Sequence, residues 1–420
     1  VSVKEVLSSD GDFTFSRGSN LAATRVGPDG LIEKGRENLK RYSNDFSNWT
    51  NYLTAETSGQ ADRSGGNTAW LLEKTGTSGS IYRTHSASGV NTFSAYVKAG
   101  TLNWVRIDFT GGGSKGYFDL QNGVVGSVIG SPIDSAIEDA GNGWYRCSVT
   151  TTSVGSGAGI SPAEGDGSIS GASGSIYIQD AQLEIGLVAT DYIESGASTG
   201  KAGLLEDEPR LDYPGGASCP SLLLEPQRTN LVTQSEYTGG YPGTGSVQEF
   251  NAAISPEGVQ NAVKIIADPS TAQHNRFTNI STTGAHSFSV FAKAAEYDFA
   301  QLYGGSGQGS RFSVVVNLTD GSIDSYDNIT TNQIDIQDYG NGWYRIVVSN
   351  FTISSTFIAL APIKQAGLSR DANYDIDYVG DNVSGAYFYG AQCEQGSYAT
   401  SYIPTYGSSV TRGADVCEDA

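Results

Sequence analysis

The chain has 420 residues, a net charge of −20 at pH 7, 54 glycines, 23 tyrosines and 4 cysteines. This length exceeds one ordinary hydrophobic core and predicts two or three domains. So acidic a surface argues against nucleic-acid and membrane-surface partners, and no stretch approaches the roughly 18 apolar residues that membrane insertion requires. Four cysteines in so long a chain do not make a disulfide framework.

The composition predicts an all-β protein. Abundant glycine, tyrosine, threonine, serine and valine are typical of short strands joined by tight turns, and no run has the 3.6-residue period of a long helix. The sequence has no methionine, and residues 1–12 lack the basic and apolar segments of a signal peptide. We therefore expect that the initiator was lost or that the chain is a fragment.

In chain order, residues 1–36 are predicted to form an N-terminal arm, and a first domain is predicted over residues 37–195. This domain opens on Asn38-Leu39. Residues 92–97 alternate, with every second residue apolar, as a strand with one buried face does. Residues 139–144 have hairpin-turn chemistry, with Asn-Gly supplying positive φ, and lead into a strand over 144–150. Residues 174–183 alternate again and predict a long strand.

The same motifs recur in the same order in residues 229–405, the predicted second domain. Asn230-Leu231 matches Asn38-Leu39, and the Phe-Ser, Gly-Asn-Gly-Trp-Tyr-Arg and Ala-Gln segments follow in turn. The offset between copies grows from 192 to 210 residues, and 11 of the added residues lie before Ala391, where we expect a long loop. The period is far too long for a solenoid. The chain therefore predicts two tandem β-sandwiches of eight or more strands each, with a jelly-roll or related topology.

Residues 196–228 are rich in Gly and Pro and are predicted to be a linker, and residues 406–420 are predicted to be a C-terminal linker or tail of the same kind. Because the tail resembles a linker with nothing after it, we expect that a further domain once followed.

Residues present in both copies are interpreted as structural. Trp144 and Trp343 are predicted core anchors, and the thiols of Cys147 and Cys393 fall at apolar core positions. An aromatic at a matched position is also assigned to the core. The other recurrent pairs are Asp139 with Asp338 as turn caps, Arg146 with Arg345 as partners of buried acids, Glu184 with Glu394 as those acids, Trp104 with Phe299, and Trp49 with Tyr241.

Several segments resemble virion proteins of tailed bacteriophages, and the likeness spans nearly the whole chain. They are 12–18, 23–33, 209–213, the specific string 221–231 (Ser-Leu-Leu-Leu-Glu-Pro-Gln-Arg-Thr-Asn-Leu), and 402–415. The resemblance implies jelly-roll domains like the carbohydrate-binding modules of polysaccharide-degrading enzymes and phage adhesins. It also implies a location on the virion surface, on head or tail, and supplies no binding residue.

Sugar-binding modules of this kind stack sugars on exposed aromatic rings. Aromatics without a match in the other copy are therefore the candidates for glycan binding: Trp70, Tyr297 and Tyr303. The long loop offers four carboxylates at alternating positions that suit Ca²⁺, although a solvated acidic loop is the favoured interpretation. These residues are Asp371, Asp375, Asp377 and Asp381. No other cofactor is expected.

Signals for catalysis are weak. The Gly-x-Ser-x-Gly match at 196–200 lies in the linker, outside the strand–turn–helix context of a nucleophile elbow, and the chain has 3 histidines. We expect no enzyme but a structural and adhesion component of a phage virion: a fibre, spike or capsid decoration that contacts other virion proteins and host-surface glycans. By analogy with other fibres we expect a homo-oligomer, with a trimer as the guess. The alternatives are a strict glycan-specific receptor-binding lectin and a polysaccharide depolymerase.

Overall fold

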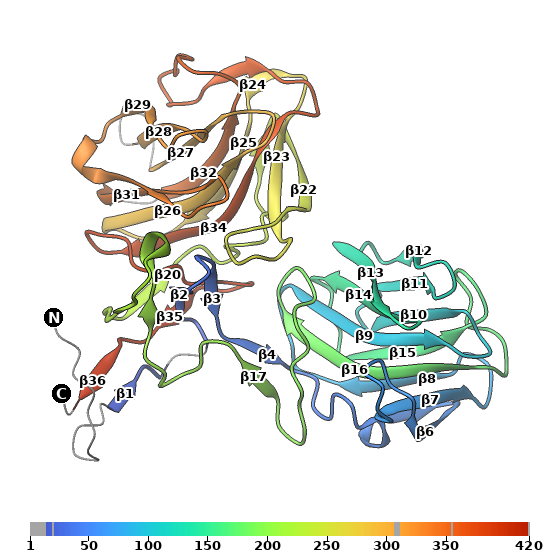
Figure 1. Cartoon of the computed structure of the whole chain (residues 1–420). Coiled ribbons are helices and arrows are strands. Elements are labelled where there is room, and N and C mark those ends of the chain that lie inside the picture. The colour runs from blue at the N-terminus through green and yellow to red at the C-terminus, as the bar shows by residue number, and fades with distance from the viewer. Residues whose placement is uncertain (1–13, 19–20, 306–310, 354–355, 419–420) are drawn as a thin grey trace. The chain divides into compact units, whose positions relative to one another are not determined.

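The computed structural model describes residues 14–18, 21–305, 311–353 and 356–418. These form strands and short 3₁₀ turns, as expected for an all-β protein (Figure 1). None of the helices in these ranges has the length and apolar character needed to cross a bilayer. The chain divides into two compact units. The first unit is Arg36–Ala202, and the second combines Val1–Gly35 with Gly203–Ala420.

The first unit is a sandwich of two antiparallel six-stranded sheets, ordered β12-β11-β10-β15-β8-β5 and β13-β14-β9-β16-β7-β6. A short pair, β4 with β17, closes the ends of the unit. Its elements are β4 (Arg36–Asn38), η2 (Phe46–Asn48), β5 (Thr50–Tyr52), β6 (Thr54–Gln60), β7 (Ala69–Lys74), β8 (Ser80–Thr84), β9 (Asn91–Ala99), β10 (Trp104–Thr110), β11 (Lys115–Asp119), β12 (Val124–Ile129), β13 (Asp134–Gly141), β14 (Trp144–Thr151), β15 (Gly157–Ala163), β16 (Ser175–Ile185) and β17 (Gly200–Ala202).

The second unit contains a sandwich of the same topology. Its sheets are ordered β29-β28-β27-β32-β25-β21 and β30-β31-β26-β34-β23-β22, strand for strand the order of the first sandwich. Its sandwich elements are β20 (Arg228–Asn230), β21 (Gly243–Thr244), β22 (Ser246–Ala253), β23 (Ala262–Ala267), β24 (Thr271–Gln273), β25 (Asn275–Ile280), β26 (Gly284–Ala294), β27 (Phe299–Gly305), β28 (Arg311–Asn317), β29 (Ile323–Asp327), η4 (Thr331–Gln333), β30 (Ile334–Asp338), β31 (Trp343–Ile353), β32 (Thr356–Ile363), β33 (Asp377–Val379), β34 (Gly385–Gln395) and β35 (Val410–Arg412). The predicted duplication of a β-sandwich is confirmed.

The repeated Asn-Leu motif has the same structural task in both copies. The side-chain amide of Asn38 donates to the carbonyl oxygens of Ala181 and Ile193 at 3.1 and 2.8 Å, and its Oδ1 accepts from the backbone N–H of Leu183. Asn230 makes the matching bonds in the second copy, to Ala391 and Ile403 at 3.2 and 2.8 Å. One buried amide therefore ties the start of each sandwich to its last long strand, which explains why the motif recurs.

Other repeated residues also have the predicted structural roles. Trp144 and Trp343 are 1% and 2% exposed, and Cys147 and Cys393 are buried in the two sandwich cores. Trp49 and Tyr241 are buried as well. At the two hairpins, Oδ1 of each recurrent aspartate accepts the N–H of the glycine two residues later, and each Asn-Gly pair has positive φ. The aspartates are Asp139 and Asp338, and the pairs are Asn142-Gly143 and Asn341-Gly342.

The recurrent arginines have partners that differ from the prediction. Arg146 and Arg345 donate to the hydroxyls of Ser94 and Ser289 on the neighbouring strand, at 3.2 and 3.0 Å. The recurrent glutamates instead accept from a threonine six residues later, Glu184 from Thr190 and Glu394 from Thr400. The predicted pairing of these arginines with these glutamates is therefore wrong at both sites, because the glutamates accept from nearby threonines and glutamines instead.

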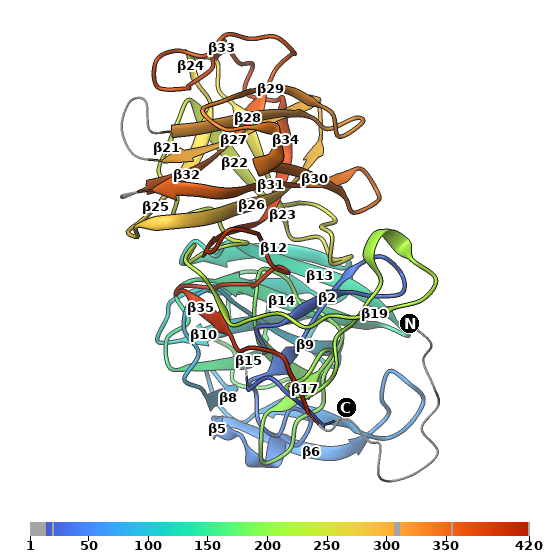
Figure 2. The same cartoon turned by 90° about the vertical axis from the view of Figure 1, so that its left-hand side faces the viewer.

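Three segments outside the sandwich pack within the second unit (Figures 1 and 2). They are the described N-terminal residues, the segment 203–227 and the described residues after Arg412. Their elements are β1 (Thr14–Ser16), β2 (Thr24–Val26), β3 (Ile32–Lys34), β18 (Leu211–Asp212), η3 (Pro214–Gly216), β19 (Ser221–Leu222) and β36 (Val416–Glu418). β2 pairs with β3, β18 with β19, and β1 with β36. The arm and the linker thus form two hairpins on the second sandwich.

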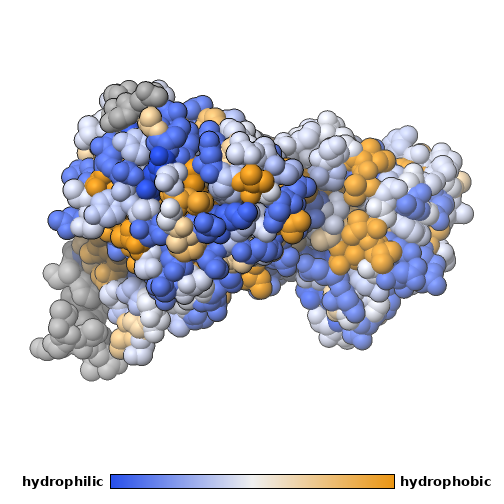
Figure 3. All heavy atoms as spheres, turned by 90° about the horizontal axis from the view of Figure 1, so that it is seen from above, coloured by the Kyte–Doolittle hydropathy of each residue, from blue (hydrophilic) through white to orange (hydrophobic). Residues whose placement is uncertain are grey.

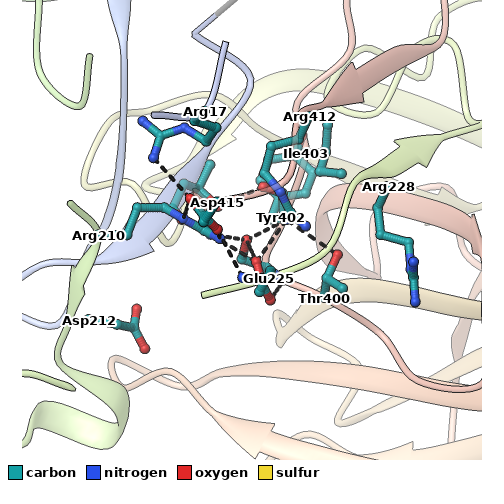
Figure 4. A network of polar contacts seen from close by, with 12 residues as sticks. Arg17, Arg210, Asp212, Glu225, Arg228, Thr400, Tyr402, Ile403, Arg412 and Asp415 are labelled. Carbon is teal, nitrogen blue, oxygen red and sulfur yellow. Dashed lines mark hydrogen bonds and ion pairs between the residues drawn. The ribbon is translucent and has the colours of Figure 1, made fainter. Parts of the chain in front are cut away.

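Two ionic clusters fasten these segments. In one, the Lys34 ammonium of β3 lies 2.9 Å from both Glu236 and Glu257, whose side chains are fully buried. In the other, Asp415 is paired with Arg17 at 3.2 Å and with Arg210, and Glu225 lies 2.8 Å from both Arg210 and Arg412 (Figure 4). Each cluster joins residues nearly 200 positions or more apart in the sequence.

The edge strand β12 of the first sandwich is apolar and exposed (Figure 3). Val124, Val125, Val128 and Ile129 are 38–49% exposed, and Figure 3 shows apolar patches on the first sandwich. The matching strand of the second sandwich, β29, carries Asp324 and Asp327 instead. Charged residues on an edge strand discourage pairing with another chain, so β12 is the less protected edge.

His85 gives the first unit a pH dependence. Burial, and secondly the nearby charge of Lys40, lower the pKa of His85 to about 4. In the unfolded chain His85 takes up a proton near its ordinary pKa of about 6.5. The stability that neutral His85 contributes is therefore fully present above pH 6.5 and is lost as the pH falls toward 4. We expect a loss of about 1–2 kcal/mol over this window. Unfolding of the wild type and of His85→Asn, compared between pH 7 and pH 4, should show a loss that is larger in the wild type by this amount. An equal loss in both would contradict it.

Candidate functional site

The candidate site is the outer face of the sheet β12-β11-β10-β15-β8-β5 in the first sandwich. Val105, Ile107 and Phe109 of β10 point into the core, so the alternate residues of this strand point outward. The strand registers place matching residues of the neighbouring strands on the same side. Together they are Thr50, Tyr52, Ser80, Tyr82, Thr84, Trp104, Arg106, Asp108, Thr110, Lys115, Tyr117, Asp119, Gly157, Gly159, Ser161 and Ala163. We call this set the outer face.

A group of charges lies at the middle of the outer face. The Arg106 guanidinium donates to the Ser161 hydroxyl at 3.0 Å and lies 3.4 Å from the Asp108 carboxylate. Asp108 is directly opposite Lys115 in the strand pair. Burial raises the pKa of Asp108, while the charges of Arg106, Lys115 and Lys40 oppose the rise. Nε of Arg106 is buried and has no hydrogen bond to any described residue. The group therefore combines a carboxylate acceptor with two cationic side chains.

Tyr82 lies beside this group on a floor of small residues. It pairs with Gly159 of β15, and a Cβ atom at Gly159 would come within 2.8 Å of Tyr82 Cβ. A side chain at Gly159 would therefore push the tyrosine away. Tyr82 is half-buried and Tyr52, on the edge strand β5, is 55% exposed. Aromatic rings next to hydrogen-bonding groups are what recognition of a sugar requires, since a sugar has apolar C–H faces and polar edges.

The matching face of the second sandwich is covered. The segment 364–384 between β32 and β34, where the sequence predicted a long loop, packs Ile376 and Tyr378 onto Tyr303, Ala359 and Ala361. β33 of this segment pairs with β24 at the edge of the sandwich, as Figure 2 shows near the top of the molecule.

Polar bonds hold the covering segment in place. Arg370 donates to Ser313 and Ser325 and pairs with Asp327, while Gln301 donates to the carbonyl oxygen of Tyr374. The inserted residues therefore cover this sheet face in the second copy. The first copy lacks the insertion, and its Arg106 and Asp108 side chains keep 13% and 15% of their surface exposed.

The three aromatic candidates from the sequence do not lie together or face solvent. Tyr297 and Tyr303 are 5% and 2% exposed and belong to the apolar cluster beneath the covering segment. Trp70 is half-buried on β7, donates its indole N–H to Asn44 at 2.9 Å and packs against the core of the first sandwich. The expectation of exposed stacking platforms is wrong for both tyrosines, because each lies under the loop that their copy gained.

The four aspartates of the loop do not converge on a cation. Asp371 Oδ1 accepts from the N–H groups of Asn373 and Asp375, and Asp381 accepts from Val383 and Ser384, bonds that lower the pKa of Asp381 to about 2. Asp375 lies 3.9 Å from Arg311. Asp377 begins β33 and is exposed. Across the described ranges no group of three or more His, Cys, Asp and Glu side chains is placed to hold a metal ion. Asp371 and Asp381 therefore cap their own turns, and the four carboxylates do not form the predicted calcium site.

The outer face was missed because matched aromatics were assigned to the core. Trp104 and Phe299 do match, but both are half-buried on outer faces, and the neighbouring Val105 and Ala300 are the buried residues. A usable signal lay in the following residues. Aligning β10 with β27 sets Arg106 against Gln301 and Asp108 against Tyr303, so the copies differ at alternate positions of one strand.

No family model and no curated protein matches this chain. Among solved structures, the chain is similar to the N-terminal CBM22-1–CBM22-2 tandem domain of Paenibacillus barcinonensis Xyn10C. The identity is 13%, over 85% of this chain and 96% of that chain, with a TM-score of 0.25. It is also similar to the tandem CBM51 modules of Sp3GH98, the family 98 glycoside hydrolase from Streptococcus pneumoniae SP3-BS71. Here the identity is 11%, over 90% and 99% of the two chains, with a TM-score of 0.18. Likeness at these TM-scores carries no argument about the site.

Proposed function

We propose that the protein binds glycans, and that the first sandwich holds a saccharide across its outer face. The observation that carries the proposal is the contrast between the copies. The same sheet face is covered by residues 364–384 in the second sandwich, while in the first it presents Tyr82 and Tyr52 beside the Arg106–Asp108 pair. A sugar ring stacks on the tyrosines, and its hydroxyls donate to Asp108 and accept from Arg106.

Substitutions taken from the second copy test this proposal. We expect Arg106→Gln, which introduces the residue found at Gln301, and Tyr82→Ala each to weaken polysaccharide binding about tenfold, the equivalent of about 1.4 kcal/mol. The matched control is Tyr326→Ala, which removes a 42% exposed tyrosine from the second sandwich. Affinity electrophoresis of the full chain in gels containing host surface polysaccharides measures the effect. Equal retardation of all four proteins would refute the outer face as the site.

The proposed role is binding without catalysis. The outer face carries two carboxylates, Asp108 and Asp119, at opposite ends of the β10–β11 pairing. Asp119 accepts from the N–H groups of Gln121 and Asn122 and so caps its own turn, whereas glycoside hydrolysis uses a facing pair of carboxylates. Incubation of the full chain with a polysaccharide that it binds should release no new reducing ends. Release of reducing ends would favour the depolymerase alternative, and tight binding of one defined glycan in an array would favour the strict lectin.

We further propose that the glycan-binding surface is displayed on a phage particle, as a fibre, spike or capsid decoration. The resemblance of the 221–231 string and of the 402–415 segment to tailed-phage virion proteins supports this location. Contacts with other virion proteins and a homotrimeric state belong to the same proposal. Immunogold labelling of purified particles tests it, and particles without label would contradict it.

A further inference from the structure

The second unit, which does not contain the outer face, has a cavity of about 800 Å³. Its walls come from four segments: the hairpin β2–β3, the segment 212–225, the turn between β30 and β31, and residues 399–402. A volume of this size holds a small organic ligand. The cavity is formed entirely by residues of one compact unit.

Hydrogen bonds between the wall segments hold the cavity open in one shape. Asp212 Oδ1 accepts from the N–H of Val26 at 2.7 Å, and the Thr24 hydroxyl donates to the carbonyl oxygen of Tyr402 at 2.6 Å. Behind the wall, Arg210 donates to the carbonyl oxygen of Thr24 at 3.0 Å and joins the buried network with Asp415 and Glu225 (Figure 4). A preformed cavity loses little conformational entropy when it binds a ligand.

The lining offers hydrogen-bond acceptors and donors together. Asp212, Asp338 and Asp29 contribute carboxylates, and Figure 4 shows the Asp212 carboxylate apart from the ion pairs of the network. Arg345 also lines the cavity, is 3% exposed, and donates from one terminal nitrogen to the Ser289 hydroxyl and to the carbonyl oxygen of Thr400. Burial raises the pKa of Asp212. A hydroxyl group suits such a lining, because it donates to a carboxylate and accepts from a guanidinium.

An aromatic ring in the lining distinguishes the two copies. The turn reads Asp338-Tyr339-Gly-Asn-Gly in the second sandwich, where the first has Asp139-Ala140-Gly-Asn-Gly. Tyr339 is half-buried, lines the cavity and packs edge-on against Phe291, with ring centroids 4.9 Å apart. The turn itself needs no aromatic residue, since the first copy forms it with Ala140. Tyr339 therefore occurs in the copy whose turn lines a cavity together with the β2–β3 hairpin.

We propose that this cavity is a second ligand site, which binds a neutral polyhydroxylated molecule the size of a mono- or disaccharide. Tyr339 contacts the carbon skeleton, Asp212 and Asp338 accept from its hydroxyl groups, and Arg345 donates to one of them. The site differs from the outer face because it surrounds a short saccharide, whereas the outer face is a sheet surface that an extended chain can cross.

Saturation-transfer NMR tests the proposal on the full chain, with the methyl glycosides of glucose, galactose, mannose and N-acetylglucosamine as probes. We expect at least one probe to receive saturation at millimolar concentration. Tyr339→Ala, which reproduces the turn of the first sandwich, and Asp212→Asn should each weaken that probe about tenfold. Tyr326→Ala, which removes an exposed tyrosine of the same unit that does not line the cavity, is the matched control and should leave it unchanged. Arg106→Gln reports separately on any binding of the probe at the outer face.

This experiment can refute the cavity site without refuting the outer-face site. Absence of transfer to all four probes overturns the cavity, even if polysaccharide binding at the outer face is normal. A probe whose binding is lost in Arg106→Gln and kept in both Tyr339→Ala and Asp212→Asn overturns it as well. Loss in Asp212→Asn, with the unfolding temperature of the second unit unchanged, supports it even if Tyr339→Ala does not fold.

Discussion

Replacing Lys34 by methionine should lower the free energy of unfolding of the second unit by about 3–5 kcal/mol. The Lys34 ammonium lies 2.9 Å from Glu236 and 2.9 Å from Glu257, and both carboxylate side chains are fully buried. Methionine keeps the length of the side chain and removes the charge. Two buried carboxylates would then remain next to each other without this cation, which is the costly outcome for a buried ion pair that loses one partner.

The tyrosines around the pair do not replace the positive charge of Lys34. The hydroxyls of Tyr389, Tyr402 and Tyr406 donate to Glu236 at 2.9–3.1 Å, so the carboxylate is already held by neutral donors. Burial raises the pKa of Glu236, and the neighbouring Glu257 raises it further while Lys34 lowers it. Without Lys34 the carboxyl would take up a proton to lose its charge.

Calorimetry of the full chain measures the effect, provided that the two units unfold in separable transitions. Only the transition of the second unit should move in Lys34→Met. The double variant Lys34→Met with Glu236→Gln should recover part of the loss, since one of the two carboxylates is then neutral. A loss below about 1 kcal/mol in the single variant would show that the pair contributes no more than an exposed ion pair does.

The second large effect is expected from the two recurrent tryptophans. Trp343→Ala should destabilise the second unit by about 3–5 kcal/mol, and Trp144→Ala should destabilise the first unit by a similar amount. The indole of Trp343 is 2% exposed, packs with Phe291 and Tyr389, and donates its N–H to the carbonyl oxygen of Ile254 at 3.0 Å. Alanine would leave a cavity and an unpaired carbonyl oxygen.

Each of these two variants serves as the matched control for the other. Each changes the same residue type at the same position of the duplicated turn, in a different compact unit. Because Trp343 is the tryptophan of the second unit, its fluorescence reports on that unit when the other four tryptophans are replaced by phenylalanine. A shift of both calorimetric transitions by either variant alone would contradict independent unfolding of the units.

The sequence was sufficient to predict the duplicated sandwich because both signals are local. Alternation over residues 92–97 reports one buried face, and Phe93, Ala95 and Val97 are all fully buried. The turn residues Asn142 and Asn341 report positive φ at hairpins. Because each motif occurs in both copies, the two copies gave independent support for the same strand or turn.

The candidate sites depend on contacts that no local pattern reports. Tyr303 reads as an unmatched aromatic, yet it is buried because a segment about 70 residues later covers it. Lys34 reads as one more surface lysine, but its partners are 202 and 223 residues away. Trp104 was assigned to the core because an aromatic residue recurs at this position. In β10, however, the inward residues are Val105, Ile107 and Phe109, so Trp104 is on the opposite side of the strand.

The composite second unit has a consequence for the order in which the protein folds during synthesis. Residues Arg36–Ala202 are contiguous, so the first unit can fold as soon as they leave the ribosome. The hairpin that carries Lys34 must wait for Glu236 and Glu257, and Arg17 must wait for Asp415. At roughly 5–20 residues per second, the last of these contacts forms some 20–80 seconds after Arg17 is made. During that interval the second sandwich, on which the N-terminal hairpin packs, is not yet complete, so the apolar side of the hairpin is exposed. A chaperone that binds short exposed segments would bind this hairpin.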